Sequence, residues 1–201
     1  MKRLFLILAA AALFAQASNA GTITYLAILL GTSENPATGS PGIGAATVII
    51  DTVAQTMEVD VTFSGLLGTT TASHIHCCET APNLNNNVGV ATTTPYFTGF
   101  PIGVTSGTYD HTFDLTMASS YNPSFVTAQG SLANAEAALL AGLANQETYL
   151  NIHTTVDPGG EIRGILSQAT PEPATLFLAG TALLGLGVLR RRTKRSDAGQ
   201  N

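Results

Sequence analysis

Short stretches in which apolar and polar residues alternate restrict this chain to a small set of folds. In TMEVDVTF, residues 56–63, every second side chain is apolar, as a strand with one buried and one solvated face requires. TYDHTFDL, residues 108–115, repeats the pattern. Stretches rich in Thr, Val, Ile, Tyr and Phe predict further strands at residues 22–30, 44–50, 71–77, 148–154 and 161–168. Many short strands separated by Gly, Pro and Asn predict an all-β fold, either an antiparallel β-sandwich or a barrel.

One segment departs from this alternation and predicts a single short helix late in the chain. In NAEAALLAGLAN, residues 134–145, the apolar residues recur near helical spacing. Asn134 is the predicted N-cap, because its side chain can accept a hydrogen bond from the first turn. Residues 79–106 are rich in Asn, Thr, Pro and Gly, and they predict a long loop with room for a short strand at 87–92.

The N-terminus has the three parts of a secretory signal peptide. Lys2 and Arg3 precede a short apolar run, and the small residues SNA at positions 18–20 form a cleavage site. We therefore predict that residues 1–20 form a signal helix that is removed. The mature chain would then meet an oxidising environment.

The C-terminus predicts a transmembrane helix followed by a basic tail. Residues 174–189 carry no charge, and a helix of that length spans about 24 Å, slightly less than a hydrocarbon core of ~30 Å. Five of the six residues at 190–195 are Lys or Arg, which predicts a cytoplasmic location for them.

The order of parts in residues 171–201 resembles the PEP-CTERM sorting signal. The matching parts are the PEP tripeptide at 171–173, the apolar span and the three arginines at 190–192. The resemblance implies export from a Gram-negative bacterium, with the precursor held transiently in the inner membrane by residues 174–189. It also implies processing by an exosortase and delivery to the cell surface or the extracellular space.

The central region, residues 21–170, has the length of one domain and is strongly acidic. It contains one Lys or Arg residue, Arg163, and eleven of the thirteen acidic residues, which gives a formal net charge of −10 against −5 for the whole chain. Binding to nucleic-acid phosphates needs clustered Lys and Arg, so nucleic acid is excluded as a partner of this domain.

Four motifs in the central region resemble the CHRD domain, a module named after repeats in chordin. They are SENPATGSPGIGAATVIID, TFSGLLGTTTASHIHCC, LLAGLANQETYLNIHT and PGGEIRGIL, and they occur in the family's order between about Leu30 and Leu166. The resemblance implies a secreted all-β module without an established catalytic activity. The family often has Gly or a polar residue after HIH, so Cys77 and Cys78 depart from its pattern.

The motifs HIH and NIHT place three histidines on two predicted strands. His74 and His76 share one face of their strand, with Cα atoms about 6.6 Å apart, and His153 belongs to the other strand. If the two strands are neighbours, the three imidazoles can converge on one copper or zinc ion. The alternative, in which each histidine only forms structural hydrogen bonds, stays open.

Cys77 and Cys78 are the only cysteines in the chain. Neighbouring Cα atoms lie about 3.8 Å apart across a trans peptide, whereas a disulfide usually needs about 4.4–6.8 Å. Export nevertheless disfavours two free thiols. Three states stay open: a disulfide between these neighbours, a bridge to another molecule, and two free thiols.

Arg163 is the one Lys or Arg residue among many acids, so a merely solubilising role would be unusual. We predict a partly buried structural ion pair, with Glu34 as the first candidate partner and Asp157 as the second.

No motif for a catalytic triad is recognisable, which predicts a non-enzymatic protein that needs no cofactor. We expect a secreted or surface-displayed module that binds a component of the extracellular matrix, either polysaccharide or protein. The PEP-CTERM resemblance favours this partner, because such signals accompany exopolysaccharide production. The alternative is a copper- or zinc-binding metalloprotein built on His74, His76 and His153. A third hypothesis is a redox sensor built on Cys77 and Cys78.

Overall fold

The computed structural model describes residues 21–78 and 86–169. The predicted signal peptide, the predicted sorting segment with its transmembrane helix at 174–189, and residues 79–85 of the predicted loop lie outside the described residues. Within the described ranges, no helix is both long and apolar enough to cross a membrane.

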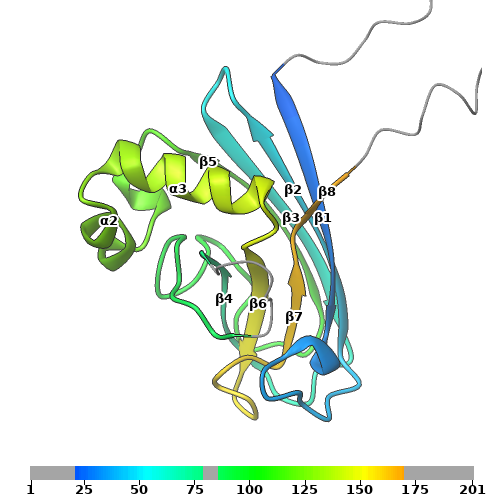
Figure 1. Ribbon diagram of the computed structural model, residues 1–201. Helices are drawn as coiled ribbons and strands as arrows, with labels where there is room; N and C mark the ends of the chain where they lie inside the picture. The colour runs from blue at the N-terminus through cyan, green and yellow to red at the C-terminus, as the bar shows by residue number, and fades with distance from the viewer. Residues whose placement is uncertain (1–20, 79–85, 170–201) are drawn as a thin grey trace, which may run out of the picture. The chain divides into compact units, whose positions relative to one another are not determined.

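The described residues form one antiparallel sheet of eight strands (Figure 1). The strands follow the order β4-β6-β7-β1-β2-β3-β5, and the short strand β8 pairs with β1 beside this path. This arrangement confirms the predicted all-β antiparallel fold. The bounds are Thr22–Leu30 (β1), Ile43–Asp51 (β2), Thr56–Ser64 (β3), Thr70–His76 (β4), Gly107–Asp114 (β5), Tyr149–Thr154 (β6), Ile162–Ile165 (β7) and Ser167–Gln168 (β8).

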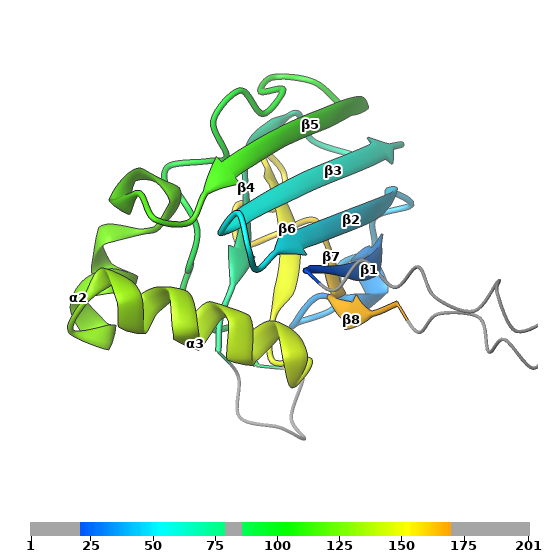
Figure 2. The same cartoon turned by 90° about the horizontal axis from the view of Figure 1, so that it is seen from above.

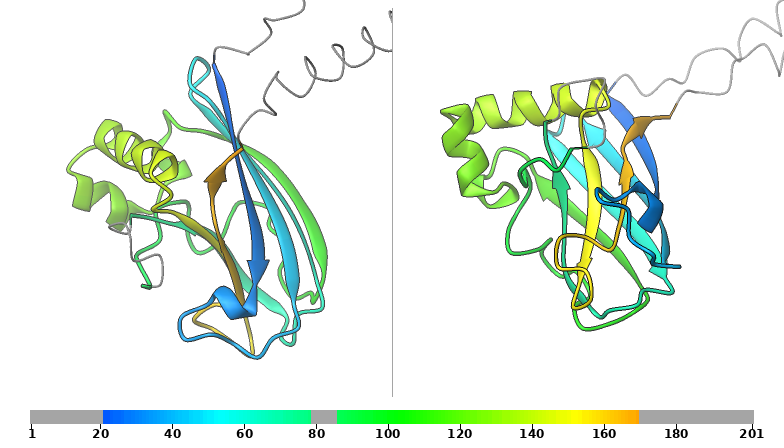
Figure 3. Two further views of the ribbon diagram at one scale, coloured as in Figure 1. Left: turned by 45° about the vertical axis from the view of Figure 1, so that its right-hand side comes forward. Right: turned by 60° about the horizontal axis from the view of Figure 1, so that its bottom comes forward.

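The sheet is strongly curled, so that the part made of β4, β6 and β7 faces the part made of β2, β3 and β5 (Figure 2). Two α-helices, α2 (Pro123–Gln129) and α3 (Leu132–Ala144), lie at one end of the curl (Figures 1 and 3). Two 3-10 turns, Gly31–Ser33 and Ala118–Ser120, complete the regular elements of the described part. The helices add four side chains to the hydrophobic core: Phe125, Ala135, Leu139 and Leu143.

The alternation in the sequence decides which strand faces are buried. In β3, Met57, Val59 and Val61 are fully buried and line the core, while Asp60 between them is exposed. Burying one apolar side chain of this size contributes about 1.5–3 kcal/mol, so a one-residue shift in register would lose several such contributions. Because this alternation is visible in the sequence, the bounds of the predicted strands lie within a residue or two of the observed bounds over most of the sheet.

The structure corrects the predicted start of the late helix and adds a second helix. Helix α3 begins at Leu132, and its N-cap is Ser131 rather than Asn134. Ser131 has an extended backbone and its hydroxyl accepts a hydrogen bond from the Asn134 N–H at 3.1 Å, so Asn134 lies inside the first turn. Helix α2 has an Asn N-cap followed by Pro and ends at Gly130, whose φ of 83° permits the left-handed C-cap.

Two predicted strand segments also differ from the structure. The segment predicted as one strand at 161–168 is divided into β7 and β8, and Leu166 between them donates its N–H to the Thr148 carbonyl. Residues 87–92 do not form a strand. Instead, Val90 and Thr92 make isolated bridges with His76 and Tyr121.

Candidate metal centre

Strands β4, β6 and β7 have two faces of opposite chemical character. On the inner face, Ile75, Leu150, Ile152 and Ile162 are fully buried in the hydrophobic core. The strand pairing places polar side chains together on the other face: His74 and His76 from β4, Tyr149, Asn151 and His153 from β6, and Arg163 from β7. These residues are buried or half-buried as well. A polar cluster is therefore enclosed between the sheet and the loops that cover it.

The three histidines predicted as metal ligands converge within this cluster. One ring nitrogen of each lies within 4.8 Å of the other two. Ring centroids are 5.2 Å apart for His74 and His153, 5.7 Å for His76 and His153, and 5.8 Å for His74 and His76. The pairing of β4 with β6 brings them together, and this pairing could not be derived from the sequence.

The second nitrogen of each imidazole is held by a backbone carbonyl, which defines the tautomer. His74 Nε2 lies 2.6 Å from the Pro95 oxygen, His76 Nδ1 lies 2.8 Å from the Val88 oxygen, and His153 Nδ1 lies 3.0 Å from the Pro158 oxygen. A carbonyl oxygen can only accept, so each of these nitrogens carries the proton. The other nitrogen of each ring therefore has a free lone pair.

The free nitrogens are His74 Nδ1, His76 Nε2 and His153 Nε2. All three are buried, and within the described part of the chain they have no hydrogen-bond partner. Leaving one buried acceptor unpaired costs about 1–3 kcal/mol, and three at one place need an explanation. Backbone carbonyls that orient imidazoles through their second nitrogen are the usual outer shell of histidine metal sites. The arrangement therefore fits a metal ion better than a purely structural role.

Burial also keeps the imidazoles neutral. Burial lowers the pKa of His74 and of His76 to about 4, and the hydrogen bonds to carbonyl oxygens offset only part of this effect. Burial lowers the pKa of His153 as well. A metal ion competes with protons for imidazole nitrogens, so a cluster that is already deprotonated near neutral pH is prepared to bind one.

Two further side chains border the histidines. Tyr149 stacks on His76, with ring centroids 4.7 Å apart and planes inclined by 7°. Asn151 lies opposite His74 in the ladder, and its Oδ1 is buried without a partner in the described part of the chain. Gly160, with φ of 133°, lets the covering loop approach this amide, because a side chain there would collide with Asn151.

The guanidinium of Arg163 connects the polar cluster to the loops. Its Nε donates to the Ser33 carbonyl at 2.6 Å, and its Nη1 donates to Asn87 Oδ1 at 2.8 Å. The guanidinium also lies over the Tyr149 ring, 4.6 Å from the centroid. The exposed fraction of Arg163 is 2%. Its role is therefore to join buried loop groups to the sheet, and it is not a solvated surface charge.

Glu34 approaches Arg163 as the sequence predicted, but the contact is loose. Its Oε2 lies 3.8 Å from Arg163 Nε, whose hydrogen bond goes to Ser33. Burial raises the pKa of Glu34 to about 7, while Arg163 lowers it in part and Asp157 raises it further. Asp157, the second predicted partner, therefore acts on Glu34 through charge repulsion.

Glu161 is an important residue that sequence reasoning missed, although it lies in the motif PGGEIRGIL. It is fully buried, and its carboxylate accepts four hydrogen bonds. Oε1 accepts from the Ser40 hydroxyl at 2.5 Å and the Leu67 N–H at 2.6 Å, and Oε2 accepts from the Gly68 N–H at 3.0 Å and the Thr154 hydroxyl at 2.6 Å. These donors come from three separate parts of the chain, and this distance along the sequence is why no local pattern revealed them.

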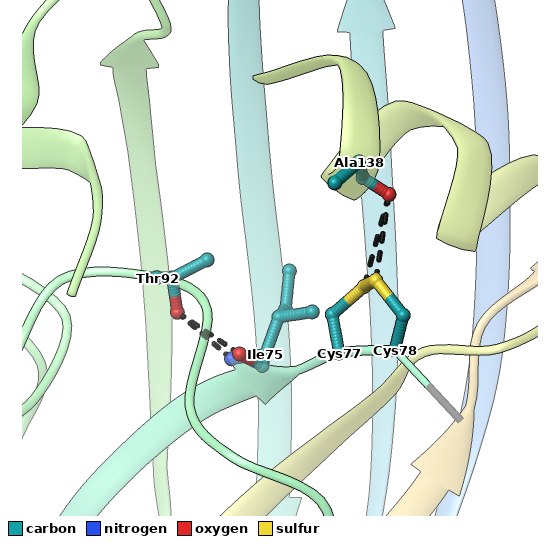
Figure 4. The surroundings of a disulfide bond; sticks show 5 residues. All are labelled: Ile75, Cys77, Cys78, Thr92 and Ala138. Carbon is teal, nitrogen blue, oxygen red and sulfur yellow. Dashed lines mark hydrogen bonds between the residues drawn. A yellow bond between two sulfur atoms is a disulfide. The ribbon is translucent and has the colours of Figure 1, made fainter. Parts of the chain in front are cut away.

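Cys77 and Cys78 are joined to each other by a disulfide that directly follows β4 (Figure 4). Both sulfur atoms lie near the carbonyl oxygen of Ala138 in α3, at 3.8 and 3.4 Å. Gly142 makes this approach possible, because a Cβ there would be 2.6 Å from the Cys77 sulfur. Of the states that the sequence left open, the structure contains the bridge between neighbours.

Two protein-family models match the chain. Residues 25–166, well over half of the chain, match the CHRD domain. The chain belongs to the CHRD domain family. All residues of the histidine cluster, the disulfide and the Glu34–Arg163 contact lie inside this CHRD match. Residues 169–192 match the PEP-CTERM protein-sorting motif. No curated protein and no solved structure matches the chain.

The two matches together describe an exported surface protein. The PEP-CTERM motif implies export in a Gram-negative bacterium through a membrane-anchored precursor, and processing by an exosortase at the C-terminus. The CHRD domain is the folded β part that this route delivers.

Proposed function

We propose that this CHRD domain binds one copper or zinc ion through His74 Nδ1, His76 Nε2 and His153 Nε2. Two observations carry the proposal: these three nitrogens are buried without a hydrogen-bond partner among the described residues, and one ring nitrogen of each histidine lies within 4.8 Å of the other two. Their protonated counterparts are held by three backbone carbonyls, so no rearrangement of tautomers is needed before binding.

The protein would hold the ion without acting as an enzyme on large substrates. Each free nitrogen is buried, so a polymer could not reach an ion bound there. A bound copper or zinc ion supplies Lewis acidity, and copper can also exchange electrons. The role of the chain's own residues is to orient three lone pairs and to exclude water. This combination favours a metal-holding surface module.

Metal analysis of the full chain, purified in mild detergent and loaded with copper or zinc, tests the proposal. We expect one ion per chain in the wild type and loss of the ion in His76→Asn and His153→Asn. His111→Asn is the matched control, because His111 lies on β5 between Tyr109 and Phe113 and outside the cluster. Folded cluster variants that retain the ion, or a folded wild type that takes up neither metal, would refute it.

A second proposal is that the exported domain contacts a component of the extracellular matrix after it reaches the cell surface or leaves the cell. It is supported by exposed aliphatic residues on the outer face of β1 and β2, where Leu26, Ile28 and Ile43 are 49, 59 and 52% exposed. Ile28 and Ile43 also line a shallow hollow, together with Thr62, Phe63 and Thr108. An apolar surface of this kind suits a protein or polysaccharide partner.

Cosedimentation of the full chain with purified matrix polysaccharide, and separately with purified matrix protein, tests this second role. Ile28→Asp should reduce cosedimentation. Thr52→Asp should leave it unchanged, because Thr52 lies in the turn after β2, at the opposite end of that strand from Ile43. Equal cosedimentation of both variants with the wild type would show that the hollow is not the contact surface.

A further inference from the structure

The charge around the histidine cluster restricts which ion it can hold. The three ligand groups are neutral imidazoles, and the groups that orient them are neutral carbonyls. Among the described residues, no carboxylate or thiol belongs to the group of close ligand atoms. A bound ion would therefore keep its full formal charge inside a buried site.

A nearby positive charge makes a highly charged ion still less favourable. The Arg163 guanidinium lies over one side of Tyr149, and the Tyr149 ring stacks on His76. Arginine is always protonated, so this charge is permanent. Among the described residues its nearest carboxylate is Glu34, whose Oε2 lies 3.8 Å from Arg163 Nε. This carboxylate compensates the charge incompletely, because burial raises the pKa of Glu34 to about 7.

We propose that the site prefers a monovalent ion, Cu(I), to the divalent ions Cu(II) and Zn(II). This inference rests on the proposed metal-binding function and specifies its ion. The cost of moving an ion from water into a poorly polarisable interior grows with the square of its charge, so it is about four times greater for a divalent ion. Neutral imidazoles suit copper, and three of them are a sufficient set for an ion that accepts low coordination numbers.

For zinc, by contrast, the site lacks two features that zinc sites usually have. Zinc usually takes four ligands, and the fourth at a site with three protein ligands is water or substrate. The free histidine nitrogens are shielded from solvent, and no described carboxylate lies close enough to compensate the charge. Asn151, which lies opposite His74 in the ladder, has a buried acceptor, Oδ1, without a partner among the described residues, and this group is neutral.

Asn151 therefore offers a direct way to alter the preference. Asn151→Asp changes one charge with almost no change in volume, at the position opposite His74. A carboxylate there should favour divalent ions more than Cu(I), because the attraction between charges is proportional to their product. Asn151→Ala removes the amide without adding charge and separates the effect of charge from the effect of the lost side chain.

The test measures the affinity of the full chain for three ions by competition with colour-forming chelators. Cu(I) is measured without oxygen and with ascorbate, and Cu(II) and Zn(II) are measured in air. We expect the wild type to bind Cu(I) most tightly, and Asn151→Asp to raise the affinity for Zn(II) relative to Cu(I) by about tenfold or more. Asn151→Ala should not produce this shift.

The possible failures are distinguishable. If a divalent ion binds to the wild type more tightly than Cu(I), and still requires His76 and His153, the preference for a monovalent ion is wrong while the metal-binding function stands. If none of the three ions binds to folded protein, the proposed function itself is wrong. The wild-type measurement alone decides the preference, so it does not depend on the folding of Asn151→Asp.

Discussion

Replacing Glu161 by Gln should destabilise the domain strongly, although the two side chains have nearly the same shape. The carboxylate receives one backbone N–H and one hydroxyl at each oxygen. Whichever way a glutamine amide is turned, its NH2 group faces the N–H of Leu67 or of Gly68, and two donors cannot bond. The hydroxyls of Ser40 and Thr154 can rotate to accept, but the backbone groups cannot.

The magnitude follows from the four hydrogen bonds. One charge-assisted bond worth about 1.5–3 kcal/mol is lost, and each of the others weakens towards the value of a neutral bond, about 0.5–1.5 kcal/mol. At the low ends of these ranges the sum is about 4.5 kcal/mol. For a domain of this size that corresponds to a fall in melting temperature of roughly 10 °C. His153 should also be less well held, because Glu161 fixes the end of the loop that carries the Pro158 carbonyl.

Thermal and urea unfolding of the full chain at pH 7, with Glu136→Gln as control, measures this loss. Glu136 bonds only to exposed Gln55 among the contacts of the described part, so its replacement should cost less than about 1 kcal/mol. Burial by itself would raise the pKa of Glu161, but the four hydrogen bonds lower it below its ordinary value. The carboxylate therefore stabilises the fold above the unfolded pKa, and the difference between wild type and Glu161→Gln should shrink as the pH falls below about 4.5. A loss no larger than that of the control would refute the reasoning.

Three further predictions concern the ion pair, the helix start and the histidines. Arg163→Gln should lower the free energy of unfolding by about 3–5 kcal/mol, and by more at pH 8 than at pH 5. The pKa of Glu34 is raised to about 7, so at pH 8 the ionised Glu34 loses its only nearby cation among the described residues. Equal losses at the two pH values, measured by unfolding, would contradict this. Ser131→Ala should lower the free energy of unfolding by about 1 kcal/mol, because the helix loses its N-cap bond. Asn134→Ala removes only an exposed hydrogen bond to the Gln129 carbonyl and should cost clearly less in the same thermal assay. The reverse order would restore Asn134 as the cap. In metal-free protein, folding lowers the pKa of His74 and of His76 to about 4, so the unfolded chain binds more protons than the folded one between pH 6.5 and about 4. The free energy of unfolding should therefore fall as the pH is lowered through this window, by up to about 3 kcal/mol per histidine. The variant carrying His74→Asn and His76→Asn should lose most of that slope and keep the part that comes from His153. An unchanged slope would show that these imidazoles are not the groups that titrate.

The strands could be predicted from the sequence because their burial depends on the identity of every second residue. The pattern of Met57, Val59, Val61 and Phe63 needs no knowledge of strand order. Helix α2 was missed because seven residues are too few for a helical period to become visible, although Asn122, Pro123 and Gly130 mark its ends. The cap at Ser131 was missed because Asn134 is an equally good capping residue, and only the backbone conformation distinguishes them.

The candidate site could be predicted only as far as its residue types. HIH and NIHT indicated three imidazoles on strand faces, and the pairing of β4 with β6 then brought them together. The free nitrogens could not be identified, because the carbonyls of Pro95, Val88 and Pro158 belong to irregular segments without a sequence signature. The four donors to Glu161 could not be identified either, because they come from three separate parts of the chain.

The position of each imidazole and the choice of its free nitrogen are determined by different parts of the molecule. Ile75, Leu150 and Ile152 fix where each ring is attached, since they anchor the same strands in the apolar interior. The irregular segments determine which nitrogen of each ring is offered. Exchanging a covering segment, by evolution or by design, could therefore change which nitrogens face the proposed metal. The free energy of forming the underlying strands would scarcely change.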